Sequence, residues 1–92
     1  MVEFEGFDWD EANLAHATRH GVSRAEIEEA LQAGFLVVSS HTRFGETRYS
    51  TVARGSSGAL LEIVLTVRGN RLRPITAHKL KKAQRKVYEK KI

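Results

Sequence analysis

The strongest constraint on the fold is an apolar run that turns back on itself. Residues 59–67 read ALLEIVLTV, and every one of them except Glu62 is apolar or β-branched. A run of this composition and length is typical of a central strand. Gly69 and Asn70 then predict a two-residue hairpin turn, because both residue types accept a positive φ. Residues 71–77 form the returning strand, so we expect the chain to build a sheet around this hairpin.

The predicted turn fixes which side chains share a face. It pairs Thr66 with Arg73 and Glu62 with Ala77, and side chains alternate between faces along each strand. One face is apolar and is predicted to be core, whereas the other is mixed and carries Glu62 and Arg73. Pro74 cannot donate to a sheet ladder, so it predicts a sheet edge or a local break in this strand. A functional site is expected on the mixed face.

The other elements follow from caps and periodicity. Asp8 or Asp10 can cap a first helix that closes near Gly21, and Ser23 with Glu26 predicts a capping box for a second helix. Strands are predicted at residues 35–40, 47–54, 59–67 and 71–77, a last helix from Lys79 onward, and a short edge strand or extended arm at residues 1–7. The order α-α-β-β-β-β-α predicts an α+β domain with a four-stranded antiparallel meander.

The loop before the central strand decides where Arg48 points. If Gly55 to Gly58 alone form the loop, Arg48 lies opposite Leu65 on the core face. One more loop residue places Arg48 opposite Thr66, beside Arg73, and turns Tyr49 into the core. We expect the second register because it buries the aromatic side chain and exposes the cation.

Length and composition limit the class of protein. Ninety-two residues predict one domain, residues 1–92. With no cysteine, neither a disulfide nor a zinc–thiolate site can form, which is consistent with a reducing cytoplasm. There is no signal-peptide pattern at the acidic N-terminus, and no run approaches the roughly 20 apolar residues that span a bilayer. We therefore expect a cytoplasmic protein with no membrane partner.

Charge is distributed unevenly along a chain of net charge +4. Acidic residues dominate the first 30 positions and basic residues the last 14. Such asymmetry indicates a polyanionic partner, although a solvated basic helix would produce the same pattern. The candidate RNA-binding cations of this segment are Lys79, Lys82, Arg85 and Lys86.

Histidines and arginines are the candidate chemical groups. His16 and His20 have the i, i+4 spacing of zinc ligands, but without a third ligand motif we expect neither a metal nor a cofactor. The chain has no nucleophile-elbow sequence and no phosphate-binding glycine loop before a helix. Metal-free RNA cleavage needs a base for the 2′-hydroxyl, cations for the phosphate and an acid for the leaving 5′-oxygen. Arg48, Arg73 and His78, with His20 nearby, supply these types, and a plain binding surface is the alternative.

Several short motifs together resemble one protein family. They are FDWD at residues 7–10, HGVS at 20–23, GETRY at 45–49, the central strand, and RLRPITA at 71–77. In this order they resemble the BrnT toxins of bacterial type II toxin–antitoxin modules. Asn13 and His16 resemble a subgroup with NxxH in the first helix, where other members carry a lysine.

The resemblance implies a RelE-like fold and a metal-independent ribonuclease that inhibits translation. It also implies a cognate antitoxin of ribbon-helix-helix type and a possible higher-order toxin–antitoxin complex. The family's motif positions correspond here to His20, Arg48, Arg73 and residue 78, with Tyr88 in the last helix. Residue 78 is usually arginine in the family and is His78 in this chain. The alternative is a non-catalytic module that binds nucleic acid or protein on the same fold.

Overall fold

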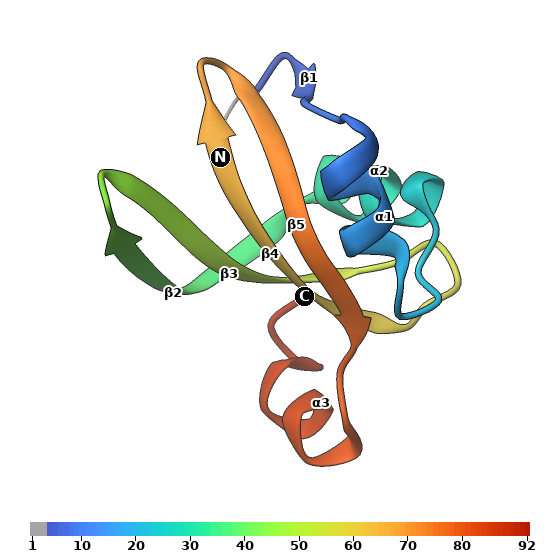
Figure 1. The fold of residues 1–92 in the computed structure, drawn as a ribbon. Coiled ribbons are helices and arrows are strands. Elements are labelled where there is room, and N and C mark those ends of the chain that lie inside the picture. The colour runs from blue at the N-terminus through green and yellow to red at the C-terminus, as the bar shows by residue number, and fades with distance from the viewer. Residues whose placement is uncertain (1–3) are drawn as a thin grey trace.

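The structure is a computed structural model that describes residues 4–92, and it has an α+β fold (Figure 1). One five-stranded sheet has the strand order β1-β5-β4-β3-β2. In chain order the elements are β1 (Gly6–Phe7), α1 (Glu11–Thr18), α2 (Arg24–Ala33), β2 (Phe35–Arg43), β3 (Glu46–Arg54), β4 (Leu60–Arg68), β5 (Arg71–Lys79) and α3 (Lys82–Tyr88). The predicted helix and strand order is confirmed, with one more strand at its start.

Strands β2 to β5 form the predicted four-stranded antiparallel meander, and the short strand β1 adds a fifth, parallel strand that makes the sheet mixed. β1 runs parallel to β5, with Phe7 opposite Leu72. The Asp8 N–H also donates to the Leu72 carbonyl at 2.8 Å. This pairing satisfies backbone groups that an exposed β5 edge would leave open. Of the segment predicted as an edge strand or an arm, residues 1–3 lie outside the described part of the chain.

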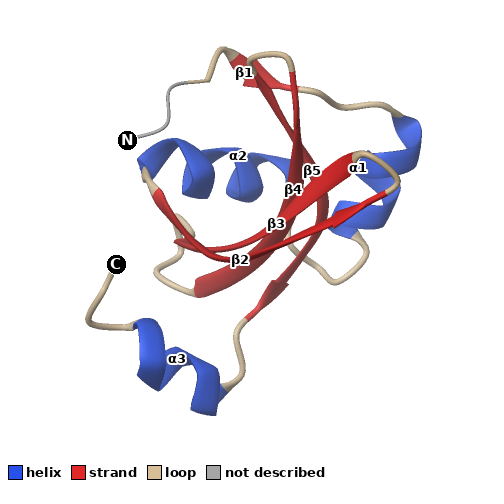
Figure 2. Cartoon of the chain, turned by 90° about the vertical axis from the view of Figure 1, so that its left-hand side faces the viewer, coloured by secondary structure: helices blue, strands red, loops and turns tan. Residues whose placement is uncertain are grey.

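Helices α1 and α2 cover one face of the sheet, whereas α3 stands apart from them (Figure 2). The main core between them is a cluster of buried side chains: Ala17, Val22, Ile27, Ala30, Leu31, Ala53, Leu61, Ile63, Leu65, Leu72 and Ala77. Ser23 accepts from the Glu26 N–H at 3.1 Å and so caps α2 as predicted. The Glu26 carboxylate does not close the predicted box, because it accepts from the Ser57 hydroxyl instead. No helix within residues 4–92 has the length and apolar character needed to cross a membrane.

The last helix is shorter and less buried than predicted. Lys79 still belongs to β5, where it pairs with Leu61, and α3 begins only at Lys82. Leu80 packs with Val52 and Leu60 in a second cluster on the sheet face that α1 and α2 leave uncovered, together with Tyr88 and Ile92. Ala83 and Val87 on α3 are exposed, Val87 by 56%. The helix is therefore held mainly at its two ends.

A bulge in β5 changes the register of the central hairpin. Thr66 pairs with Arg73 as predicted, but beyond Pro74 the ladder shifts by one residue. Ile75 is the extra residue, so Glu62 pairs with His78 and not with the predicted Ala77. The local break expected at Pro74 is confirmed, and the extra residue directly follows the proline. The shift turns Ala77 into the core and His78 onto the mixed face.

Helix α1 binds the carbonyl groups that the bulge exposes. The buried Asn13 side chain donates through Nδ2 to the Pro74 carbonyl at 2.9 Å and to the Asp8 carbonyl at 3.0 Å. His16 Nδ1 lies 2.7 Å from the Ile75 carbonyl. Asn13 Oδ1 also accepts from the Asp10 N–H, which completes a capping box. One helix thus satisfies the irregular part of the neighbouring strand.

Replacing Asn13 is expected to destabilise the fold. Asn13→Ala leaves the Pro74 carbonyl buried without its donor, so we expect a loss of about 2–3 kcal/mol in the free energy of unfolding. Chemical denaturation measures this loss. Asn13→Asp is the matched variant: it has the same shape and keeps the acceptor but lacks the donor, and we expect it to lose at least as much. Stability equal to wild type in Asn13→Asp would contradict the bond to the bulge.

Candidate functional site

A row of polar side chains crosses the mixed face of the sheet. Cross-strand pairing aligns His41 on β2, Arg48 on β3, Thr66 on β4 and Arg73 on β5. The predicted register with Arg48 opposite Thr66 is confirmed, and Tyr49 packs against the main core. The two arginines therefore lie on one face, on either side of Thr66.

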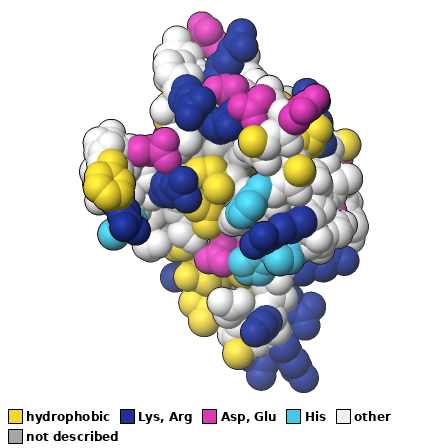
Figure 3. Space-filling view, viewed as in Figure 1, with side chains coloured by type: hydrophobic (Ala, Val, Ile, Leu, Met, Phe, Trp, Pro, Cys, Tyr) yellow, Lys and Arg dark blue, Asp and Glu magenta, His cyan; other side chains and the backbone are white. Residues whose placement is uncertain are grey.

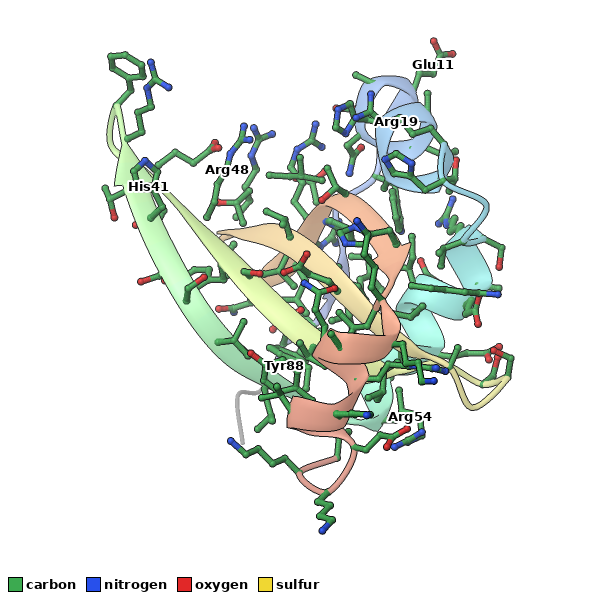
Figure 4. The ribbon with its side chains drawn as sticks, turned by 90° about the horizontal axis from the view of Figure 1, so that it is seen from below. Glu11, Arg19, His41, Arg48, Arg54 and Tyr88 are labelled. Atoms are coloured by element: carbon green, nitrogen blue, oxygen red, sulfur yellow. The ribbon has the colours of Figure 1, made fainter. Side chains whose placement is uncertain are left out.

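The arginines line a groove between this row and α1. Its volume is about 340 Å³, and its walls are Ala12, Asn13, His16, Glu46, Arg48, Thr66, Arg68, Arg73 and Ile75. In the side-chain view, Arg48 points into the space between the β2–β3 hairpin and α1 (Figure 4). An extended polar chain lying in this groove would meet guanidinium groups along it.

Every guanidinium of the groove already has a carboxylate partner. Arg73 contacts Asp10 at 2.9 Å and Asp8 at 3.5 Å, and its side chain is only 12% exposed. Arg48 is 55% exposed and contacts Glu46 at 3.0 Å. An incoming phosphate therefore has to compete with these carboxylates, and it reaches Arg48 more easily than Arg73.

A histidine pair lies farther along the same face. The ring centroids of His20 and His78 are 6.2 Å apart, with their planes nearly perpendicular. His78 Nε2 lies 3.1 Å from Glu62 Oε1, and Ser50 donates to the other oxygen of that carboxylate at 2.9 Å. Arg19 Nε donates to His20 Nε2 at 3.2 Å. Two imidazoles with different hydrogen-bond partners can exchange protons with the same ligand.

The structure brings the four predicted catalytic residues to one face in two groups. Arg48 and Arg73 share the groove, and His20 and His78 form the pair. The space-filling view shows histidines near the middle of this face beside basic and acidic side chains, with further basic side chains on α3 below (Figure 3). The predicted RNA-binding cations Lys79, Lys82, Arg85 and Lys86 are all exposed. His16 and His20 have separate partners, and within residues 4–92 no three potential ligands gather around a metal position.

Sequence reasoning did not find the roles of three residues. Asn13 and His16 hold α1 against the bulge, and their NxxH spacing, which places both on one helix face, was the available indication. The pairing of Glu62 with His78 was not predicted, because it needs the bulge to bring that side chain opposite. All three residues position parts of the site, and Asn13 and His16 also line the groove.

One carboxylate of the groove has a shifted pKa. The Asn13 backbone N–H donates to Asp10, and this bond, opposed by desolvation and helped by the Arg73 guanidinium, lowers the pKa of Asp10 below its usual 3.8. A carboxyl whose pKa is lower in the folded state stabilises the fold above its unfolded pKa. That contribution disappears as the pH falls through the folded value.

The pH dependence of stability tests this contact. Asp10→Asn keeps a side chain that can cap α1 but removes the charge that faces Arg73. We expect wild type to be more stable than the variant at about pH 6, and the difference to shrink as the pH falls below about 4. Melting temperatures across this range measure it. A constant difference at all pH values would show that the Asp10 charge is not linked to folding.

Comparison with known proteins gives one match. A family model described as ribonuclease toxin, BrnT, of type II toxin-antitoxin system matches residues 9–84. No curated protein and no solved structure matches the chain. The matched range contains the groove, the histidine pair and the start of α3.

Proposed function

The chain belongs to the BrnT family of ribonuclease toxins from type II toxin–antitoxin systems, and from this premise we propose that it cleaves RNA with its histidine pair and without a metal ion. The family implies RNA as substrate and a cognate antitoxin protein as partner. The observation that carries the proposal is the pairing of His20 with His78, 6.2 Å apart and beside Glu62, on the open face that also holds Arg48 and Arg73.

The two histidines have different proposed roles because their partners differ. His78 directs Nε2 toward Glu62, so its Nδ1 is the free proton acceptor, and we assign it as the base that takes the 2′-hydroxyl proton. His20 accepts from Arg19 at Nε2 when its imidazole is neutral, so Nδ1 then carries the one ring proton. We assign His20 as the acid in its imidazolium form, in which a proton at Nε2 replaces the bond from Arg19. The Nδ1 proton then passes to the leaving 5′-oxygen and leaves a neutral imidazole. The O2′–phosphorus bond forms as the phosphorus–O5′ bond breaks, leaving a cyclic phosphate and a 5′-hydroxyl.

The arginines are proposed to bind the phosphate and stabilise its developing charge. A guanidinium fork can bind two oxygens of one phosphate, which a lysine ammonium cannot do. Arg48 is the more exposed and would make the first contact, exchanging Glu46 for phosphate. Arg73 would follow by releasing Asp10 or Asp8. The carboxylates already paired with Arg48 and Arg73 also reduce the attraction of these arginines for other anions.

The remaining parts of the proposal rest on the family and on charge. Lys79, Lys82, Arg85 and Lys86 would contact the RNA backbone on either side of the cleaved linkage. A RelE-like fold, a single domain over residues 1–92, action in the cytoplasm, a ribbon-helix-helix antitoxin and a higher-order complex with it belong to the same proposal. Inhibition of translation would follow from cleavage of messenger RNA.

Cleavage of RNA in the presence of a chelator is the central test. We expect purified protein to cut single-stranded RNA under these conditions, and His78→Ala or His20→Ala to slow cleavage by about a hundredfold, the scale of losing one proton-transfer group. His78 is 40% exposed, so melting temperatures should stay close to wild type. Glu62→Gln should slow cleavage by a smaller factor, because it removes the carboxylate that orients His78 but leaves the imidazole.

Gln32→Ala is the control for purification, because Gln32 is exposed on α2, which packs against the opposite face of the sheet. It should cleave as wild type does. Equal cleavage by wild type and both histidine variants would refute the assigned roles. Salt-sensitive RNA binding without any cleavage would favour the alternative, a non-catalytic binding module. The carboxylates that already contact Arg48 and Arg73 are the observation in favour of this alternative.

The contribution of α3 is tested by the salt dependence of RNA binding. Lys82→Gln and Lys86→Gln each remove one exposed charge without changing a buried contact. If each contacts a phosphate, the slope of log affinity against log salt should fall by about 0.7 per substitution. Titrations of single-stranded RNA at several salt concentrations give this slope. An unchanged slope in the double variant would place the RNA away from α3.

A further inference from the structure

The tip of the β2–β3 hairpin displays an aromatic ring where a turn normally carries a small residue. Phe44 is 92% exposed. Phe44 has φ of 53° and Gly45 has φ of 76°, the positive values that a two-residue hairpin turn of type I′ requires at both central positions. Asn, Asp and Gly are preferred there, and a bulky residue in this region is an outlier. Turn geometry therefore does not account for a phenylalanine at this position.

Basic groups surround the ring. The Arg43 guanidinium lies 5.0 Å from the centre of the Phe44 ring. A hollow of about 480 Å³ is lined by His41, Arg43, Phe44, Glu46 and Arg48. Glu46 and Arg48 also line the groove that holds Arg73, so the two spaces adjoin. The β2–β3 hairpin forms the arm at the left of Figure 1, and Phe44 lies in the turn between its two strands.

We propose that Phe44 is a stacking platform for an unpaired base of the RNA, with Arg43 holding the phosphate beside it. An exposed aromatic face next to cations is how proteins bind single-stranded nucleic acid, because every base offers a π-face and every linkage a charge. The adjoining groove leads from this base past Arg48 toward Arg73. The proposal rests on the proposed function for its substrate, and it adds a binding subsite at a distance from the cleaved linkage.

One substitution in the turn can separate an effect on base stacking from an effect on the stability of the hairpin. Phe44→Asn removes the ring and places a preferred residue in the type I′ position, so the hairpin should be at least as stable as in wild type. Phe44→Trp keeps an aromatic face and should keep binding. The probe is a short single-stranded RNA with 2′-O-methyl groups, which removes the attacking hydroxyl, and with 2-aminopurine as the reporting base.

We expect Phe44→Asn to bind this probe about tenfold more weakly than wild type, the scale of one base–aromatic stack, and to lose the quenching of 2-aminopurine fluorescence. Phe44→Trp should retain both. Arg43→Gln should lower the salt slope of binding by about 0.7, as expected for one phosphate contact.

Because the probe cannot be cleaved, the result does not depend on whether the chain is a ribonuclease. Stacking that depends on Phe44, with no cleavage of ordinary RNA by wild type, would support the platform and refute the proposed catalysis. Equal affinity and equal quenching in wild type and Phe44→Asn would overturn the platform even if RNA is cleaved, and would assign the exposed ring to a protein partner instead.

Discussion

The extra residue in β5, Ile75, decides which face of the sheet the side chains at the end of that strand point to. Without it, alternation along the strand would send His78 into the core and Ala77 onto the open face. With it, His78 stands opposite Glu62 and within reach of His20. At the bulge α1 contacts two carbonyls of β5, Pro74 through the buried Asn13 amide and Ile75 through His16. The proposed site therefore depends on a helix–strand contact that itself touches no part of the histidine pair.

The positive charges of Arg48 and Arg73 on the mixed face are balanced by carboxylates of the same chain. The acidic N-terminal segment is not merely opposite in sign to the basic C-terminus, since Asp8 and Asp10 reach Arg73 and hold it in a fixed position. Fixing a guanidinium in this way limits the reorganisation needed when charge develops on a phosphate, but it weakens the attraction that brings the phosphate in. The more exposed Arg48 and the cations of α3 would then account for most of the initial attraction.

Local rules predicted most of this fold, and contacts distant in sequence account for the rest. The pairing of Arg48 with Thr66 could be predicted because only that register buries Tyr49 and exposes a cation. Pro74 indicated that β5 is irregular, but not that the ladder would resume one residue later, because that choice depends on donors from α1. The parallel pairing of β1 has no local pattern, since two residues are too few to show periodicity. The two arginines were therefore correctly expected on one face, whereas His78 reaches that face only through the bulge and the carboxylate partners of the arginines were not expected.

Helix α3 contributes few buried side chains, and this has a consequence for the order in which the molecule opens. Leu80, Tyr88 and Ile92 join it to the sheet, and Arg54 adds a bond to the Ile92 carbonyl at 3.0 Å. Detaching this segment exposes far less apolar surface than separating the sheet from α1 and α2, so we expect its amide hydrogens to exchange through a local opening and not through global unfolding. The densest group of cations thus lies on the least protected cooperative unit of the chain. Any partner that binds those cations also orders that unit, and the entropy lost in ordering it is subtracted from the affinity.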